Sequence, residues 1–117
     1  MNPLPGCEQA VIEESKLVEY ALNPHSERGR HKARVFERTL GFNLSNGEQL
    51  KQAVLDALPH HPAALTSETK FGRKYEALLS IRGPNGRMVS VLTVWQFDRL
   101  PDETFGGQPR LVTLYVP

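Results

Sequence analysis

The sequence predicts an α+β domain in which N-terminal helices pack on one side of a C-terminal antiparallel sheet of three or four strands. Apolar residues recur at roughly helical spacing in the first half of the chain, and they alternate with polar residues from Phe71 onward. Helices that come first and strands that follow are typical of this class. The 117 residues suffice for one domain, with a flexible arm over 1–8, a helical part over 9–58 and the sheet over 70–117.

The first predicted helix covers Gln9–Leu22. It should end at Asn23, because Pro24 disfavours helical geometry in the residue before it. Its apolar side chains recur at roughly helical spacing and are expected to face the core: Val11, Ile12, Leu17, Val18 and Leu22. The charged side chains between them would form a face exposed to solvent: Glu13, Glu14, Lys16 and Glu19.

A second helix should begin near Arg30 or His31 and run to Leu40, with Gly41 as its left-handed C-cap. Three of its apolar side chains share one face and are expected to be buried: Ala33, Phe36 and Leu40. The stretch that leads into this helix is rich in proline, glycine and charge. We therefore expect a loop there, which gives way to the helix at about Arg30.

A third helix is predicted to start at Asn46, because Asn46 and Gln49 have the spacing of a capping box. Pro59 should stop it after Leu58. Its buried stripe would consist of Leu50, Val54, Ala57 and Leu58. The segment from His60 to Glu68 is expected to be a turn-rich connection, with its two histidines at the surface.

Three strands are predicted over Phe71–Ile81, Met88–Phe97 and Arg110–Val116. The first two should form a hairpin in which Pro84 begins a type I turn and Gly86 is left-handed. That three-residue loop pairs Gly83 with Arg87. It places two sets of residues on one face of the hairpin: Tyr75, Ala77, Leu79 and Ile81 with Val89, Val91, Thr93 and Trp95.

Composition and charge limit the possible functions. Hydrophobic content of 39% and charged content of 23% are ordinary for a folded chain, and no apolar run approaches the roughly 20 residues that span a bilayer. The net charge of +1 predicts that any basic site is local. Cys7 is the single cysteine, so no internal disulfide is expected, and we predict a cytoplasmic location. The residue pattern suggests no metal site and no cofactor.

The strongest chemical signal is the stretch from Pro24 to Arg34, which contains His25, His31 and Lys32. A helix start exposes unpaired N–H groups and the positive end of the dipole, which favour an anion. Arg30, His31 and Lys32 beside that end would form a cradle for a phosphate or a carboxylate. Two histidines are also suitable for acid–base chemistry near neutral pH.

The strands contribute further candidates. Arg73 and Lys74 should project from opposite faces of the first strand, where they would bind phosphate or serve as edge charges that deter aggregation. The other two strands offer hydroxyl and aromatic groups that would bind phosphate oxygens and stack on bases if they share one face: Thr93, Trp95, Thr113 and Tyr115. The same residue types also fill the cores of sheets.

Several segments together resemble a small bacterial family of unknown function, whose members occur as stand-alone proteins and as C-terminal cassettes of toxins. The resemblance lies in His25–Phe36, Leu40–Asn43, Phe71–Tyr75, Gly83–Gly86, Thr93–Trp95 and Pro109–Tyr115. The order of helices and strands is also similar to the barnase–EndoU–colicin–RelE ribonuclease fold. That resemblance implies a metal-independent ribonuclease toxin with a small antitoxin or immunity protein as partner.

We therefore hypothesise an endoribonuclease that cleaves RNA, with tRNA as one candidate, and leaves a 2′,3′-cyclic phosphate. We expect His31 to act as the base and His25 or Tyr115 as the acid. Lys32 and Arg73 would stabilise the negative charge of the transition state, and Thr93 and Thr113 would position the phosphate. Further contacts with the substrate would come from Arg30, Lys74 and Trp95. Two alternatives remain. One is a non-catalytic interaction module, such as an antitoxin, immunity protein or inhibitor, and the other is a nucleotide-dependent transferase.

Overall fold

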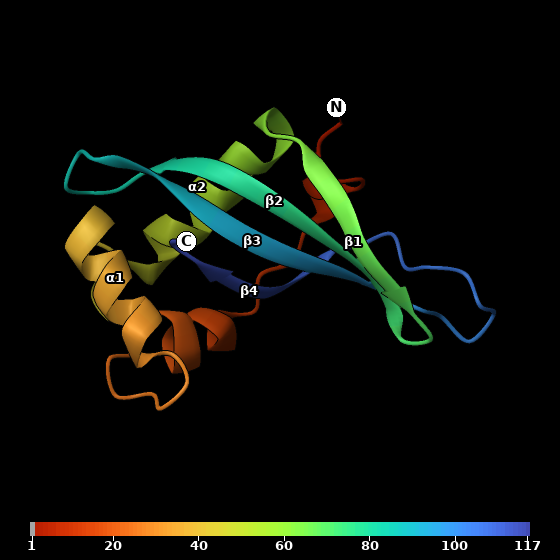
Figure 1. Cartoon of the computed structure of the whole chain (residues 1–117), viewed down its shortest axis with the longest axis horizontal. Coiled ribbons are helices and arrows are strands. Elements are labelled where there is room, and N and C mark those ends of the chain that lie inside the picture. The colour runs from red at the N-terminus through yellow and green to blue at the C-terminus, as the bar shows by residue number, and fades with distance from the viewer. Residues whose placement is uncertain (1) are drawn as a thin grey trace.

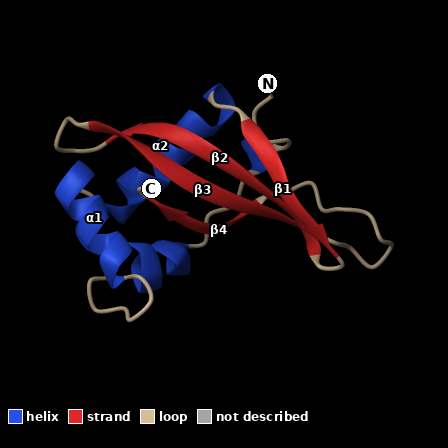
Figure 2. Cartoon of the chain, in the orientation of Figure 1, coloured by secondary structure: helices blue, strands red, loops and turns tan. Residues whose placement is uncertain are grey.

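The computed structural model describes residues 2–117, with the backbone alone for residues 18–20. This part of the chain forms two α-helices and an antiparallel sheet with strand order β1-β2-β3-β4, so the predicted α+β fold is confirmed (Figures 1 and 2). The elements are α1 (Arg30–Leu40), α2 (Gly47–Ala57), β1 (Ala63–Thr69), β2 (Gly72–Arg82), β3 (Met88–Asp98) and β4 (Arg110–Tyr115). No helix of the described residues is long and apolar enough to cross a membrane.

The segment predicted as a helix over Gln9–Leu22 has a different structure. Val11 is extended and pairs in parallel with β4: its N–H donates to the Pro109 carbonyl (2.9 Å), and its carbonyl accepts from the Leu111 N–H (2.9 Å). A residue paired in this way cannot also belong to an α-helix. A short π-helix, η2 (Lys16–Ala21), follows instead.

Three of the five predicted core residues of this N-terminal segment are nevertheless buried, whereas Val11 is 39% exposed. Ile12, Leu17 and Leu22 are buried, whereas the predicted core position Val18 lies outside the described side chains. Leu4, within the segment expected to be a flexible arm, is only 1% exposed. The carbonyl of Asn2 also accepts a hydrogen bond from the start of β1. Residues 2–8 are therefore held against the rest of the fold.

The second and third predicted helices are present as α1 and α2. Gly41 closes α1 in the left-handed conformation, as expected (φ 86°). The capping box expected at Asn46 and Gln49 is absent, because the Asn46 side chain accepts no hydrogen bond from the start of α2. Asn46 instead completes a box with Asn43 around a single 3₁₀ turn, in which each asparagine side chain accepts from the backbone of the other end.

The β2–β3 hairpin has the predicted register. Ile81 pairs with Val89 and Tyr75 with Trp95, and the Gly83 N–H donates to the Arg87 carbonyl (2.9 Å). Gly83 lies so close to α1 that a Cβ atom there would be 2.0 Å from the Leu40 carbonyl oxygen. This close approach positions α1 beside the hairpin loop, at one end of the sheet in Figure 1.

β1 lies within the segment predicted to be a turn-rich connection. Its side chains are almost all exposed, so it lacks the alternation that identifies a half-buried strand. His61 helps to position it. Its Nδ1 lies 2.9 Å from the Ala57 carbonyl at the end of α2, and its Nε2 accepts from the Ser80 N–H in β2 (3.2 Å). A histidine expected at the surface thus links a helix to the sheet.

One face of the sheet packs against the helices to form the core. The buried side chains include Phe36, Leu40, Leu50 and Val54 from the helices and Leu79, Val91, Trp95, Leu111 and Leu114 from the strands. Thr93 is fully buried among them. Its hydroxyl donates to the Ala77 carbonyl (2.8 Å) and accepts from the Trp95 indole N–H (2.8 Å), so both buried polar groups are satisfied.

We predict that Thr93→Val destabilises the protein by about 1–3 kcal/mol, because the Trp95 indole N–H would remain buried without an acceptor. Thr93→Ser keeps the hydroxyl and should cost less. The measurement is the free energy of unfolding in urea, followed by tryptophan fluorescence. Equal stability of the valine variant and the wild type would contradict this role.

Candidate functional site

A hollow of about 280 Å³ lies where η2 and the start of α1 meet β4. Three of its lining residues are cations, namely Lys16, Arg28 and Lys32, and one is the hydroxyl residue Thr113. None of the lining residues in the described part of the chain is acidic. The three positive charges repel one another, and a bound anion would relieve that repulsion. The hollow, called here the cationic hollow, is therefore suited to a phosphate or a carboxylate.

Lys32 is the central residue of this region. It is half-buried, and its ammonium donates a hydrogen bond to the Thr113 hydroxyl (2.8 Å) while lying 5.3 Å from the centre of the Tyr115 ring. These two contacts orient the side chain. An ammonium group has three N–H donors, so the bond to Thr113 leaves two for a ligand.

A second hollow, of about 270 Å³, adjoins the first and shares Lys32 with it. His31, Val35, Tyr115 and Val116 complete its lining. This histidine hollow is more apolar than the cationic one, but it has an imidazole and a phenol beside the ammonium. It therefore combines an imidazole, the side chain most often used for general acid–base catalysis, with a group that donates a hydrogen bond.

The local structure at the start of α1 holds the cations in place. Gly29 is the N-cap and lines the cationic hollow. The Ser26 hydroxyl accepts from the Gly29 N–H (3.1 Å), and the Ser26 carbonyl accepts from the Arg30 N–H (2.9 Å). These bonds fix the turn in which Arg28 lies. The positive end of the α1 dipole adds to the field of the side chains.

A bulge in β4 positions the strand residues of the site. Leu111 pairs with Trp95, whereas Thr113 pairs with Val94, so Val112 is an extra residue in the ladder. As a result Leu114, rather than Thr113, lies opposite the buried Thr93. Leu111 and Leu114 both enter the core, while Thr113 and Tyr115 remain partly exposed beside Lys32.

The structure brings together four of the predicted site residues: His31, Lys32, Thr113 and Tyr115. The analysis of the sequence missed two cations, Lys16 and Arg28. Arg28 belongs to the basic stretch that we singled out, so its position in that stretch was an available signal. Lys16 had none, because it reaches the site only through the packing of η2 beside β4.

The other predicted site residues lie elsewhere. Thr93 and Trp95 are 0% exposed, so neither can contact a substrate in this structure. Arg73 forms an ion pair with Glu68 and lies over the Phe105 ring, beyond the lining of both hollows. His25 and Arg30 are exposed residues that also line neither hollow. The predicted cleft in which both threonines face the histidines is therefore not formed.

Lys74 lines a third hollow, at the end of the sheet where the β1–β2 turn lies. Within it Arg110 forms a bidentate ion pair with Asp98, with nitrogen–oxygen distances of 2.9 and 3.1 Å. The hydrogen bond from Arg110 holds the pKa of the Asp98 carboxyl below its ordinary value, with a smaller contribution from Gln96. The Asp98 carboxylate therefore stays negatively charged, and the positive charge of Arg110 balances it.

These observations define an α+β domain with a local, cation-lined hollow at the junction of a helix start and an edge strand. Among the described residues, no group of three histidine, cysteine or acidic side chains is placed to hold a metal ion. The chain matches the family model described as "Domain of unknown function (DUF6883)" over residues 3–117, and it belongs to that family. No curated protein and no solved structure matches it.

We predict that inorganic phosphate stabilises the protein through Lys32. A ligand at ten times its dissociation constant raises the free energy of unfolding by about 1.4 kcal/mol, which corresponds to a few degrees in melting temperature. The measurement is thermal unfolding with and without phosphate at constant ionic strength. Lys32→Met should abolish the shift.

The matched control is Arg38→Met, which removes a positive charge from an exposed position at the other end of α1. It should retain the full phosphate effect. If both variants respond to phosphate as the wild type does, the stabilisation arises from the general exclusion of phosphate from the protein surface, and the cationic hollow does not bind the anion.

Proposed function

We propose that this protein is a metal-independent endoribonuclease of the toxin type, with Lys32 and the two hollows around it as its active site. The observation that supports this most strongly is the position of the Lys32 ammonium. It is held by Thr113 and Tyr115, with the two cations Lys16 and Arg28 on one side and His31 on the other. Phosphate binding and proton exchange are the two requirements of RNA cleavage without a metal.

In the proposed reaction, His31 takes the proton from a ribose 2′-hydroxyl, and the 2′-oxygen attacks the adjacent phosphorus. The bond from phosphorus to the 5′-oxygen breaks, and that oxygen takes a proton from the Tyr115 phenol. The products are a 2′,3′-cyclic phosphate and a 5′-hydroxyl. Lys32 and Arg28 stabilise the negative charge that builds up on the phosphate oxygens. Thr93, Arg73 and Trp95 have no part in this revised scheme.

The resemblance of the sequence to toxin cassettes and to the barnase–EndoU–colicin–RelE fold is a second ground for the proposal, separate from the family of unknown function to which the chain belongs. It implies an RNA substrate, action in the cytoplasm and a small antitoxin or immunity protein that blocks the enzyme. The cation-lined hollow is compatible with such a partner, because an acidic segment of an inhibitor could occupy the place of the phosphate. The near-neutral net charge of +1 means that RNA affinity would depend on this local site.

We predict that the purified protein cleaves single-stranded RNA in the presence of EDTA. His31→Ala should lower the rate about 10²–10⁴-fold, the range for loss of a general base, and Lys32→Met should lower it about 10²-fold or more. The measurement is gel electrophoresis of labelled RNA, with the terminal cyclic phosphate identified by mass spectrometry. An oligonucleotide of the same sequence with 2′-deoxyribose at each position has no 2′-hydroxyl to attack and should resist cleavage.

His60→Ala is the matched control, because His60 is exposed at the end of α2 and lines none of the hollows described above. It should cleave like the wild type. Cleavage by His31→Ala at the wild-type rate would remove the catalytic proposal. So would the absence of cleavage by the wild type on total RNA and on tRNA.

A second candidate function is a non-catalytic interaction module. The burial of Thr93 and Trp95 favours it, since two of the expected substrate contacts are unavailable. Expression in bacteria distinguishes the two functions. We expect the wild type to arrest growth and His31→Ala to be tolerated if the protein is a nuclease. If bacteria tolerate the wild type and His31→Ala equally well at matched protein levels, the interaction module is favoured.

A further inference from the structure

The β1–β2 turn exposes an aromatic ring at its tip. Thr69 pairs with Gly72, so Lys70 and Phe71 are the two residues of the turn, and Phe71 is 69% exposed. Burial of such a side chain would stabilise the fold, and this position forgoes that stabilisation. The Lys70 ammonium lies 5.1 Å from the centre of the Phe71 ring. The fold alone gives no reason for an exposed ring beside a lysine.

A row of polar side chains extends from this turn across the sheet. Ser67, Lys74, Gln96 and Arg110 are consecutive partners in the four strands, so they share one face. That face is opposite to the helices, because the neighbouring pair of Tyr75 and Trp95 faces the core. The row and Phe71 together line the third hollow, of about 610 Å³. We call these residues, with Lys70, the Phe71 surface.

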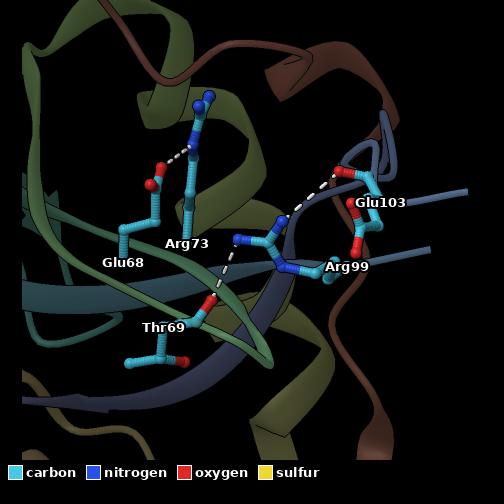
Figure 3. Close-up of polar contacts among 5 residues, drawn as sticks. All are labelled: Glu68, Thr69, Arg73, Arg99 and Glu103. Carbon is cyan, nitrogen blue, oxygen red and sulfur yellow. Dashed lines mark hydrogen bonds and ion pairs between the residues drawn. The ribbon is translucent and has the colours of Figure 1, made fainter. Parts of the chain in front are cut away.

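Hydrogen bonds and ring contacts hold this end of the sheet in a defined shape. Arg99 donates to the carbonyls of Thr69 (3.2 Å) and Glu103 (3.4 Å), and so connects the loop after β3 to the β1–β2 turn (Figure 3). Arg73 and Arg99 both lie over the Phe105 ring, at 4.0 and 4.7 Å. A turn held in this way presents Phe71 with little further loss of conformational entropy on binding.

The charges of the Phe71 surface favour an anionic partner. Asp98 is paired with Arg110, and Glu68 with Arg73, whereas Lys70 and Lys74 have no carboxylate partner in the described part of the chain. Glu76, two residues further along β2, is the nearest acid on the same face of that strand. A flat aromatic group flanked by unpaired lysines is suited to an unpaired base with its flanking phosphates.

We propose that the Phe71 surface binds single-stranded RNA, with Phe71 stacked on an unpaired base and Lys70 and Lys74 in contact with phosphates. This inference rests on the proposed function and assigns a second contact to the same substrate. Arg110 and Thr113 are three residues apart in β4, a span of about 10 Å. One strand of a few nucleotides therefore reaches from the Phe71 surface to the cationic hollow.

The test measures binding separately from cleavage. The probe is a fluorescent 2′-O-methyl RNA of about twelve nucleotides, which has no free 2′-hydroxyl to attack. Phe71→Ala should weaken binding about 10-fold, whereas Phe71→Tyr should retain it. Lys74→Ala should weaken it several-fold and reduce the dependence of the binding constant on salt by about one phosphate contact. The same sequence as a duplex should bind more weakly, because its bases are already stacked.

Two variants at the opposite end of the sheet serve as controls. Met88→Ala removes an exposed apolar side chain and Arg87→Ala an exposed cation, and both should bind like the wild type. Thermal unfolding of each variant verifies that it is folded. The cleavage assay on ordinary RNA then reports on the proposed function independently.

Wild-type affinity in both Phe71→Ala and Lys74→Ala would overturn the inference, even if Lys32→Met abolished cleavage. Equal affinity for the duplex would overturn the stacking role of Phe71. Loss of binding in these variants supports the inference whether or not the protein cleaves RNA. If a protein partner instead protects Phe71 while RNA binding is unchanged, the surface belongs to protein recognition, and the inference is again overturned.

Discussion

The pairing of Val11 with β4 is the constraint on which the arrangement of the site depends. Two backbone hydrogen bonds hold the N-terminal segment along β4. The chain runs parallel to β4 at this point, and η2 then packs beside β4 so that Lys16 lines the cationic hollow. The same pairing covers part of an edge strand that would otherwise expose its backbone groups to other chains.

Much of the fold could be predicted where local chemistry and long-range packing agree. Pro84 and Gly86 define one turn geometry, and that geometry sets the register of the whole β2–β3 hairpin. The prediction differed from the structure where packing prevails over local preference. The apolar residues around Val11 have helical spacing, but Val11 pairs with β4 instead of forming part of a helix. β1 has no buried face, so no pattern in Ala63–Thr69 distinguishes it from a loop.

The candidate site could be predicted only in part, for a similar reason. His31 and Lys32 follow from the basic stretch before a helix, which is a local signal. The expected partnership of Thr93 and Thr113 assumed strict alternation along β4, and the bulge at Val112 changes that alternation. No residue in Arg110–Tyr115 identifies the bulge in advance. The contact between Lys32 and Thr113 therefore becomes visible only in three dimensions.

The histidine hollow also has a practical consequence for anyone who handles the protein. Val116, which directly follows β4, forms part of its wall. Any polypeptide that follows Pro117, an affinity tag included, would emerge beside Tyr115 and His31, where histidine side chains of a tag would compete for the same space. The amino end offers a better attachment point, since its entry into the fold at Leu4 packs against other parts of the core.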